Sequence, residues 1–70
     1  MSVDRVIKEQ GSMVLVQTPE DHYNVRFAEW TGDSRTCSLK AAVSEKSVNG
    51  TPLNGSQYAT VKKWKEEIYQ

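Results

Sequence analysis

The residues with the greatest capacity for chemistry are a single histidine and a single cysteine. His22 follows Asp21 in a predicted turn, and such a pair acts in catalysis only when a nucleophile or a substrate pocket lies beside it. Nothing nearby in the sequence supplies either, so we interpret both side chains as solvated. Cys37 alternates in phase with Phe27 and Leu39, which favours a buried, apolar role for the thiol. The sequence therefore predicts no catalytic residue and no enzyme.

Metal and cofactor sites are not expected either. One Cys and one His, fifteen positions apart, do not complete a four-ligand zinc site. The acidic pair Glu20-Asp21 is too short a cluster for a site made of carboxylates alone. The four glycines follow no phosphate-binding pattern, and each indicates a turn or a helix cap. We expect neither a metal nor a cofactor.

The more informative feature is the second face of the predicted sheet. A single helix can cover only one face, so this second face is left uncovered by it. It presents an apolar strip with an aromatic residue, ringed by cationic and polar side chains, and such a surface is suited to docking. The candidate binding surface consists of Trp30, Arg26, Ile7, Val14, Val16, Lys40 and Asn24. The alternative is that the sheet curls into a small barrel and encloses the strip.

Four runs of β-branched and aromatic residues are predicted to be the strands that carry this surface. Turn residues lie between the runs, which indicates an antiparallel meander. The runs span residues 3–10, 13–18, 23–30 and 35–43. Gly11-Ser12, between the first two, is typical of a type II′ hairpin turn. Pairing Leu15 with Val25, and Val25 with Leu39, places the remaining apolar residues of the middle strands on one core face.

The last third of the chain predicts a loop and a helix. Residues 45–55 are rich in Asn, Gly, Ser and Pro, which indicates a loop. Ser56 or Asn54 then offers an N-cap for a helix over residues 56–69, whose apolar residues recur at helical spacing. The expected fold is α+β, with a four-stranded antiparallel meander packed by one C-terminal helix in a single domain of residues 1–70.

Composition limits the function classes. Nine Lys and Arg balance nine Asp and Glu, so the net charge is zero, unlike that of a typical DNA-coating protein. No apolar run approaches the length of a membrane span, and the N-terminus lacks the apolar stretch of a signal peptide. We expect a cytoplasmic protein with no membrane contact, and a single reduced cysteine agrees with that location.

A short resemblance points to small barrels. Residues 41–46, Ala-Ala-Val-Ser-Glu-Lys, are similar to the stretch before the C-terminal helix in the small archaeal DNA-coating proteins. A meander followed by a terminal helix also resembles the SH3-like barrels, including chromo and Tudor types. The resemblance implies DNA binding and covers six residues, but those relatives are strongly basic. We assign no family from it.

Three function hypotheses follow. The first is a small non-enzymatic protein that acts through protein-protein contact, such as a regulator or inhibitor of the kind that phages and plasmids encode, with Trp30, Arg26 and Ile7 as anchors. The alternative is a nucleic-acid-binding small β-barrel protein with a local patch of Arg26, Arg35, Lys40 and Trp30. The third is a homodimer that buries the second sheet face.

Overall fold

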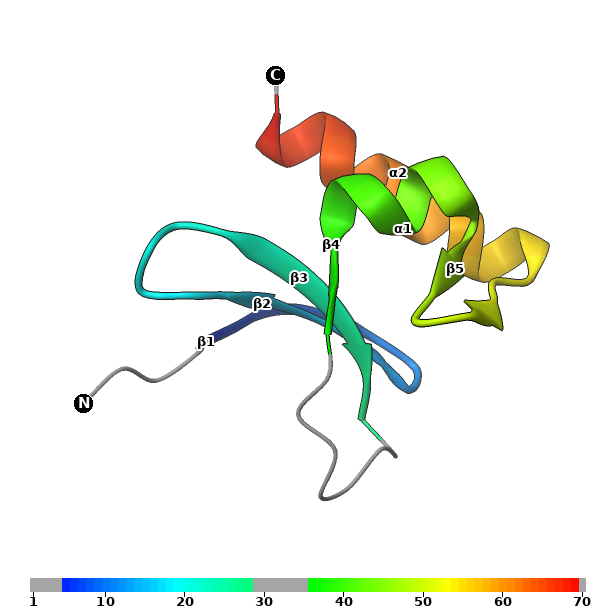
Figure 1. The fold of residues 1–70 in the computed structure, drawn as a ribbon, viewed down its shortest axis with the longest axis horizontal. Helices are drawn as coiled ribbons and strands as arrows, with labels where there is room; N and C mark the ends of the chain where they lie inside the picture. The colour runs from blue at the N-terminus through cyan, green and yellow to red at the C-terminus, as the bar shows by residue number, and fades with distance from the viewer. Residues whose placement is uncertain (1–4, 29–35, 70) are drawn as a thin grey trace.

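The computed structural model describes residues 5–28 and 36–69 of the chain. It is an α+β fold in which a four-stranded antiparallel sheet of order β1-β2-β3-β4 is joined by a two-stranded sheet, β5-β6, and two helices (Figure 1). The elements are β1 Arg5–Gln10, β2 Met13–Gln17, β3 Tyr23–Phe27, β4 Cys37–Ser38, α1 Leu39–Glu45, β5 Ser47–Val48, β6 Thr51–Pro52 and α2 Gly55–Ile68.

The first three strands form the predicted meander. Gln10 pairs with Met13 across a two-residue turn, and Gly11 adopts a φ of +59°, as the first central position of a type II′ turn requires. The predicted pair Leu15–Val25 is confirmed in the β2–β3 ladder. Turn chemistry and alternation therefore determine this half of the sheet locally.

A β-bulge in β1 changes the face that Ile7 occupies. Val6 pairs with Val16 and Lys8 with Leu15, so Ile7 is an extra residue in the ladder. A regular ladder would have placed Ile7 beside Val16 on the second face. The bulge instead turns Ile7 towards the core cluster, where it is half-buried, and leaves Val6 beside Val16. The prediction that Ile7 belongs to the second face is therefore wrong.

The predicted strand over residues 35–43 is wrong from Leu39 onward. β4 pairs Cys37 with Val25 and ends at Ser38, so the expected Val25–Leu39 pair does not form. Residues 39–45 form α1 because Leu, Lys, Ala and Glu favour a helix and the Ser38 hydroxyl accepts a hydrogen bond from the Ala41 amide at 3.2 Å. The chain thus has a second helix that the sequence did not predict.

The predicted loop over residues 45–55 contains a short hairpin. Ser47 pairs with Pro52 and Val48 with Thr51, and the turn residues Asn49 and Gly50 both have positive φ, 50° and 83°. Asn-Gly with two positive φ values is the type I′ hairpin signature. Val48 is fully buried in the core cluster, so this hairpin is part of the packed structure.

The predicted C-terminal helix is confirmed as α2. Asn54 is the N-cap, and its side-chain oxygen accepts from the Gln57 amide at 2.8 Å while the Gln57 side chain accepts from the Asn54 amide at 3.0 Å. This reciprocal capping box satisfies two of the amides that every helix start leaves unpaired. The buried stripe of α2 includes Val61 and Trp64.

The core lies between one face of the sheet and the two helices. Its buried cluster consists of Met13, Leu15, Val25, Phe27, Cys37, Leu39, Ala42, Val48, Val61 and Trp64. We call this side of the sheet the helix-covered face and the other side the second face. Among the described residues no ladder joins β1 to β4, so the strands form an open sheet and the barrel alternative has no support.

Candidate functional site

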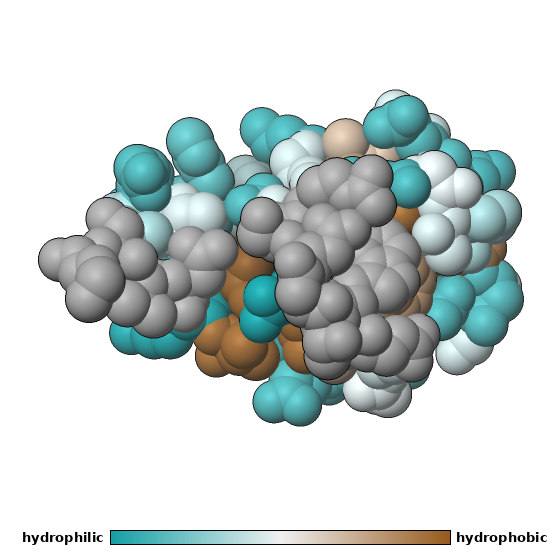
Figure 2. All heavy atoms as spheres, turned by 60° about the horizontal axis from the view of Figure 1, so that its bottom comes forward, coloured by the Kyte–Doolittle hydropathy of each residue, from teal (hydrophilic) through white to brown (hydrophobic). Residues whose placement is uncertain are grey.

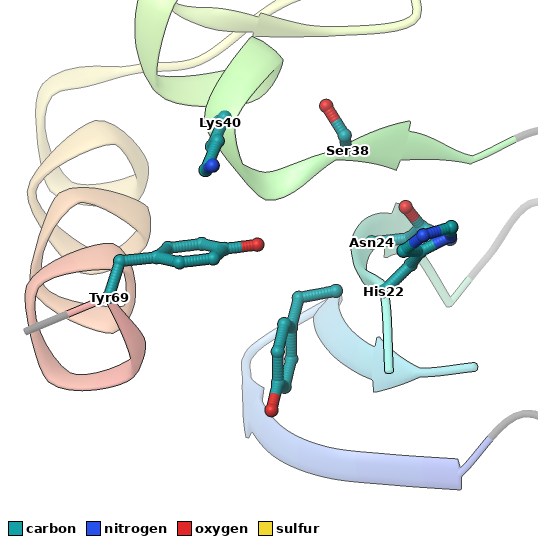
Figure 3. A pocket seen from close by; sticks show the side chains of 6 residues that line it. His22, Asn24, Ser38, Lys40 and Tyr69 are labelled. Atoms are coloured by element: carbon teal, nitrogen blue, oxygen red, sulfur yellow. The ribbon is translucent and has the colours of Figure 1, made fainter. Parts of the chain in front are cut away.

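A hollow opens at the edge of the sheet where β3 begins, β4 passes into α1 and α2 ends. It has a volume of about 340 Å³ and is lined by His22, Tyr23, Asn24, Ser38, Lys40 and Tyr69 (Figure 3). We call it the tyrosine-lysine hollow. Its size is at the lower end of the range for small-ligand pockets, which suits a single side chain or a small molecule.

The turn before β3 positions one wall of the hollow. The Thr18 amide donates to the His22 carbonyl at 2.9 Å, and the Thr18 hydroxyl accepts from the His22 amide at 3.1 Å. Asp21 takes a positive φ of 64° in this turn, and its carboxylate accepts from the Gln17 side chain at 2.9 Å. These bonds define where Tyr23 and Asn24 enter the strand.

The junction of β4 and α1 supplies the opposite wall. Ser38 is the last strand residue, pairs with Asn24 and caps α1. The first turn of the helix then carries Lys40 over the hollow, and Figure 3 shows its side chain directed towards Tyr69. Had the strand continued as predicted, Lys40 would lie on the flat of the sheet, so the unpredicted helix creates this wall.

Tyr69 closes the hollow from the end of α2. Its ring lies edge-to-face against Tyr23, with ring centroids 5.8 Å apart and planes at 84°. The Lys40 ammonium lies 4.5 Å from the centroid of the same ring, which is within range of a cation-π interaction. Tyr69 nevertheless keeps 40% of its surface exposed. The three elements therefore meet through one aromatic ring that a ligand can still reach.

The charges in the hollow are unbalanced. Among the described residues that line it, Lys40 is the one Lys or Arg and none is acidic. Among the described residues the ion pair that forms joins Lys8 to Glu67, at 3.1 Å, and Lys40 has no carboxylate partner. The side chains of His22 and Asn24 also make no hydrogen bond within this part of the chain. The hollow thus combines aromatic surface, a cation and unused polar groups.

The structure separates the residues of the predicted binding surface. Asn24 and Lys40 line the hollow, and Arg26 is exposed on the second face. Val14 and Val16 also lie on that face but are only 6% and 1% exposed, so they offer little area to a partner. Ile7 packs against the core, as described above. Trp30 lies outside the described residues.

The second face still carries some apolar surface. Val6, which pairs with Val16, is 43% exposed. Figure 2, with the lower side of Figure 1 brought forward, shows hydrophobic residues bordered by hydrophilic ones. Val6 and Tyr69 are the two exposed large hydrophobic residues of the described chain. They lie in the two competing sites and so allow a direct comparison.

The reactive residues of the sequence do not form a catalytic arrangement in the described part of the chain. The Asp21 carboxylate is bonded to Gln17 and not to His22. Cys37 is buried, as its alternation predicted, and its thiol lies 3.5 Å from the Ser38 carbonyl oxygen and 3.9 Å from that of Ser47. No group of three His, Cys, Asp or Glu residues comes together within residues 5–28 and 36–69.

Sequence reasoning missed Tyr23 and Tyr69 as site residues. The alternation of the middle strands predicts Tyr23 on the core face, and it is half-buried against the core cluster while it also lines the hollow. Tyr69 follows the last apolar residue of α2, Ile68, and so interrupts the helical stripe. An aromatic residue at a helix end, beyond the buried stripe, is the signal that could have identified it.

Comparisons with models of protein families, with curated proteins and with solved structures found no match to this chain. No helix in the described ranges has the length and apolar character needed to span a membrane. The candidate site is therefore described from the geometry of the hollow alone.

Proposed function

We propose that this chain is a small non-enzymatic binding protein, of the regulator or inhibitor kind, that contacts another protein through the tyrosine-lysine hollow. The observation that carries the proposal is the exposed ring of Tyr69, held by Tyr23 and Lys40 above a hollow of about 340 Å³. The partner would insert one side chain into the hollow and pack around its rim.

The physical basis is the distribution of binding energy in protein interfaces. Tyr, Trp and Arg are enriched among the residues that dominate affinity, and they do so where a pocket excludes water around them. A ring that is already held by an edge-to-face contact loses little conformational entropy on binding. Tyr69 is such an aromatic residue and its ring is already held against Tyr23, whereas Val6 on the second face is aliphatic.

The test compares these two exposed residues. The wild-type chain, Tyr69→Ala and Val6→Ala would be immobilised in equal amounts, and the proteins that each captures from cell extract would be quantified by mass spectrometry. We expect Tyr69→Ala to capture at least about tenfold less of any specific partner, which corresponds to a loss of about 1.4 kcal/mol in binding free energy. Val6→Ala should capture as much of that partner as the wild type. Circular dichroism would show that both variants remain folded.

The opposite pattern would reject the hollow. If Val6→Ala loses the partner and Tyr69→Ala keeps it, the second face is the binding surface, as the sequence predicted. If both variants capture the same proteins as the wild type, neither surface binds a partner and the proposed function is wrong.

Nucleic-acid binding is the second candidate, and one observation favours it. Arg26 and Lys40 are both exposed, and neither has an ion-pair partner among the described residues. Two free cations on neighbouring elements can contact phosphates while Tyr69 stacks on a base. Such binding must weaken steeply as salt rises. The absence of a gel shift with single-stranded oligonucleotides at low salt would remove this candidate.

A further inference from the structure

We propose that the side chain received by the tyrosine-lysine hollow is acidic, so that the partner presents an Asp or Glu carboxylate to Lys40. This inference rests on the proposed function and specifies its partner chemistry. It depends on the charge of the hollow and on the polar groups around it, which are independent of the exposure of Tyr69.

The first argument is charge complementarity. Lys40 contributes one positive charge, no Asp or Glu is among the described lining residues, and no described carboxylate pairs with the ammonium. The cation-π contact with Tyr69 uses one side of the ammonium, at 4.5 Å from the ring centroid. An ammonium has three N–H donors, so it can donate to an anion while it remains over the ring. A cationic side chain from a partner would instead meet a like charge.

The second argument is the set of neutral polar groups around Lys40. The side-chain amide of Asn24 can donate two hydrogen bonds and makes none within the described residues. The Ser38 hydroxyl accepts from the Ala41 amide, and its own hydrogen is left to donate. Figure 3 shows Ser38 and Asn24 on the side of the hollow opposite Tyr69. A carboxylate placed between Lys40 and these groups finds donors for both oxygens.

The third argument separates a carboxylate from a phosphate. A phosphorylated side chain carries close to two negative charges near neutral pH and is usually recognised by clusters of Arg. Within residues 5–28 and 36–69 the lining of the hollow has one Lys and no Arg, so its charge matches a singly charged group. The tyrosine rings provide apolar surface for the methylene groups that carry the carboxylate in Asp or Glu. An acidic side chain fits both properties of the hollow.

The test uses defined peptide probes on the isotope-labelled full chain. Three capped pentapeptides would be identical except for a central Glu, Gln or phosphoserine, and each would be titrated while NMR follows the Asn24 side-chain amide and the backbone amides of Ser38 and Lys40. We expect the Glu peptide to bind about fivefold more tightly than the Gln peptide, the ratio that a partly exposed ion pair supplies. This preference should shrink as salt increases.

Variants of Lys40 complete the design. Lys40→Met should abolish the preference for Glu over Gln, and Lys40→Arg should keep it because the charge remains. Lys63→Met is the matched control, since Lys63 is exposed on α2 and does not line the hollow. It should leave the preference unchanged.

Several outcomes would overturn the inference. Equal binding of the Glu and Gln peptides at the hollow would show that charge is not recognised, yet it would leave the proposed function intact. Tighter binding of the phosphoserine peptide would assign the hollow to phosphate groups. If the Glu peptide shifts none of the three signals at millimolar concentration, the carboxylate site does not exist. The proposed function itself fails only in the Tyr69 capture experiment.

Discussion

The side chains on both faces of β2 are buried, but only those on the helix-covered face belong to the core cluster. Met13 and Leu15 point into the core beneath the helices, where Leu15 is completely enclosed. Val14 and Val16, their alternate neighbours, lie on the second face outside that cluster and are nevertheless 6% and 1% exposed. A strand that is apolar on both sides is typical of a central strand covered twice. The apolar character of Val14 and Val16 therefore accompanies burial, and these two side chains offer little surface to a partner.

The hollow that we propose for recognition lies instead at the rim of the sheet, where three elements end. The tyrosine-lysine hollow receives residues from β3, from the β4–α1 junction and from the end of α2. Side chains at the ends of elements have fewer neighbours and are more exposed to solvent than side chains in the middle of a strand. The contrast between the middle of the sheet and its rim can be tested by substitution.

The largest effect should come from the helix-covered face. Leu15→Ala removes a fully enclosed side chain between the sheet and the helices and should lower the free energy of unfolding by about 3 kcal/mol. That loss is comparable to the whole stability expected of so small a domain, so the variant should be largely unfolded. Urea denaturation followed by circular dichroism would measure it. A loss below about 1 kcal/mol would mean that the helices do not pack against this face in solution.

A smaller effect should distinguish two valines of the second face. Val16→Ala should lower the free energy of unfolding by about 2 kcal/mol because Val16 is buried, whereas Val6→Ala should cost less than roughly 0.5 kcal/mol because Val6 is 43% exposed. Thermal denaturation of the two variants side by side would give the difference. Equal and small losses would show that the second face is open to solvent, and the contrast drawn above would fail.

The smallest effect should come from the cap of the helix that covers the core. Asn54→Ala removes the side-chain oxygen that accepts from the Gln57 amide and should lower the free energy of unfolding by about 1 kcal/mol. Ser56→Ala is the control, since Ser56 is exposed in the first turn of α2 and its side chain makes no described hydrogen bond. Because Tyr69 lies at the other end of α2, Asn54→Ala should leave peptide binding at the hollow unchanged. Equal stability of the two variants would show that the cap contributes nothing.

Local signals accounted for the parts of the fold that short-range chemistry determines. Gly11 in the hairpin turn and the Leu15–Val25 register were predicted from neighbouring residues and are confirmed, and of the two predicted N-cap candidates, Ser56 and Asn54, the structure has Asn54. The Asn49-Gly50 turn was equally local, and composition alone led to the wrong prediction of a loop. The two residues Asn49-Gly50 are themselves a type I′ hairpin signature in the sequence.

Other features were ambiguous at short range. Cys37, Leu39 and Ala41 alternate as in a strand, yet Leu39 and Ala42 are also spaced as on a helix, and a run this short fits both periods. The Ser38 cap and the packing of α1 against α2 decide for the helix. The bulge at Ile7 has no local sequence signal that we can identify, although it decides that Ile7 packs against the core cluster and that Val6 pairs with Val16.

The sequence by itself determined the α+β class, the meander of β1 to β3 and the capped helix α2, because turns, alternation and caps act over a few residues. It also identified Asn24 and Lys40 as binding candidates. Only the tertiary structure decided that these two residues meet Tyr69, which is 29 positions after Lys40 in the chain. Such a meeting depends on where a strand gives way to a helix and on how two helices pack, and both are set by long-range contacts that no local pattern encodes.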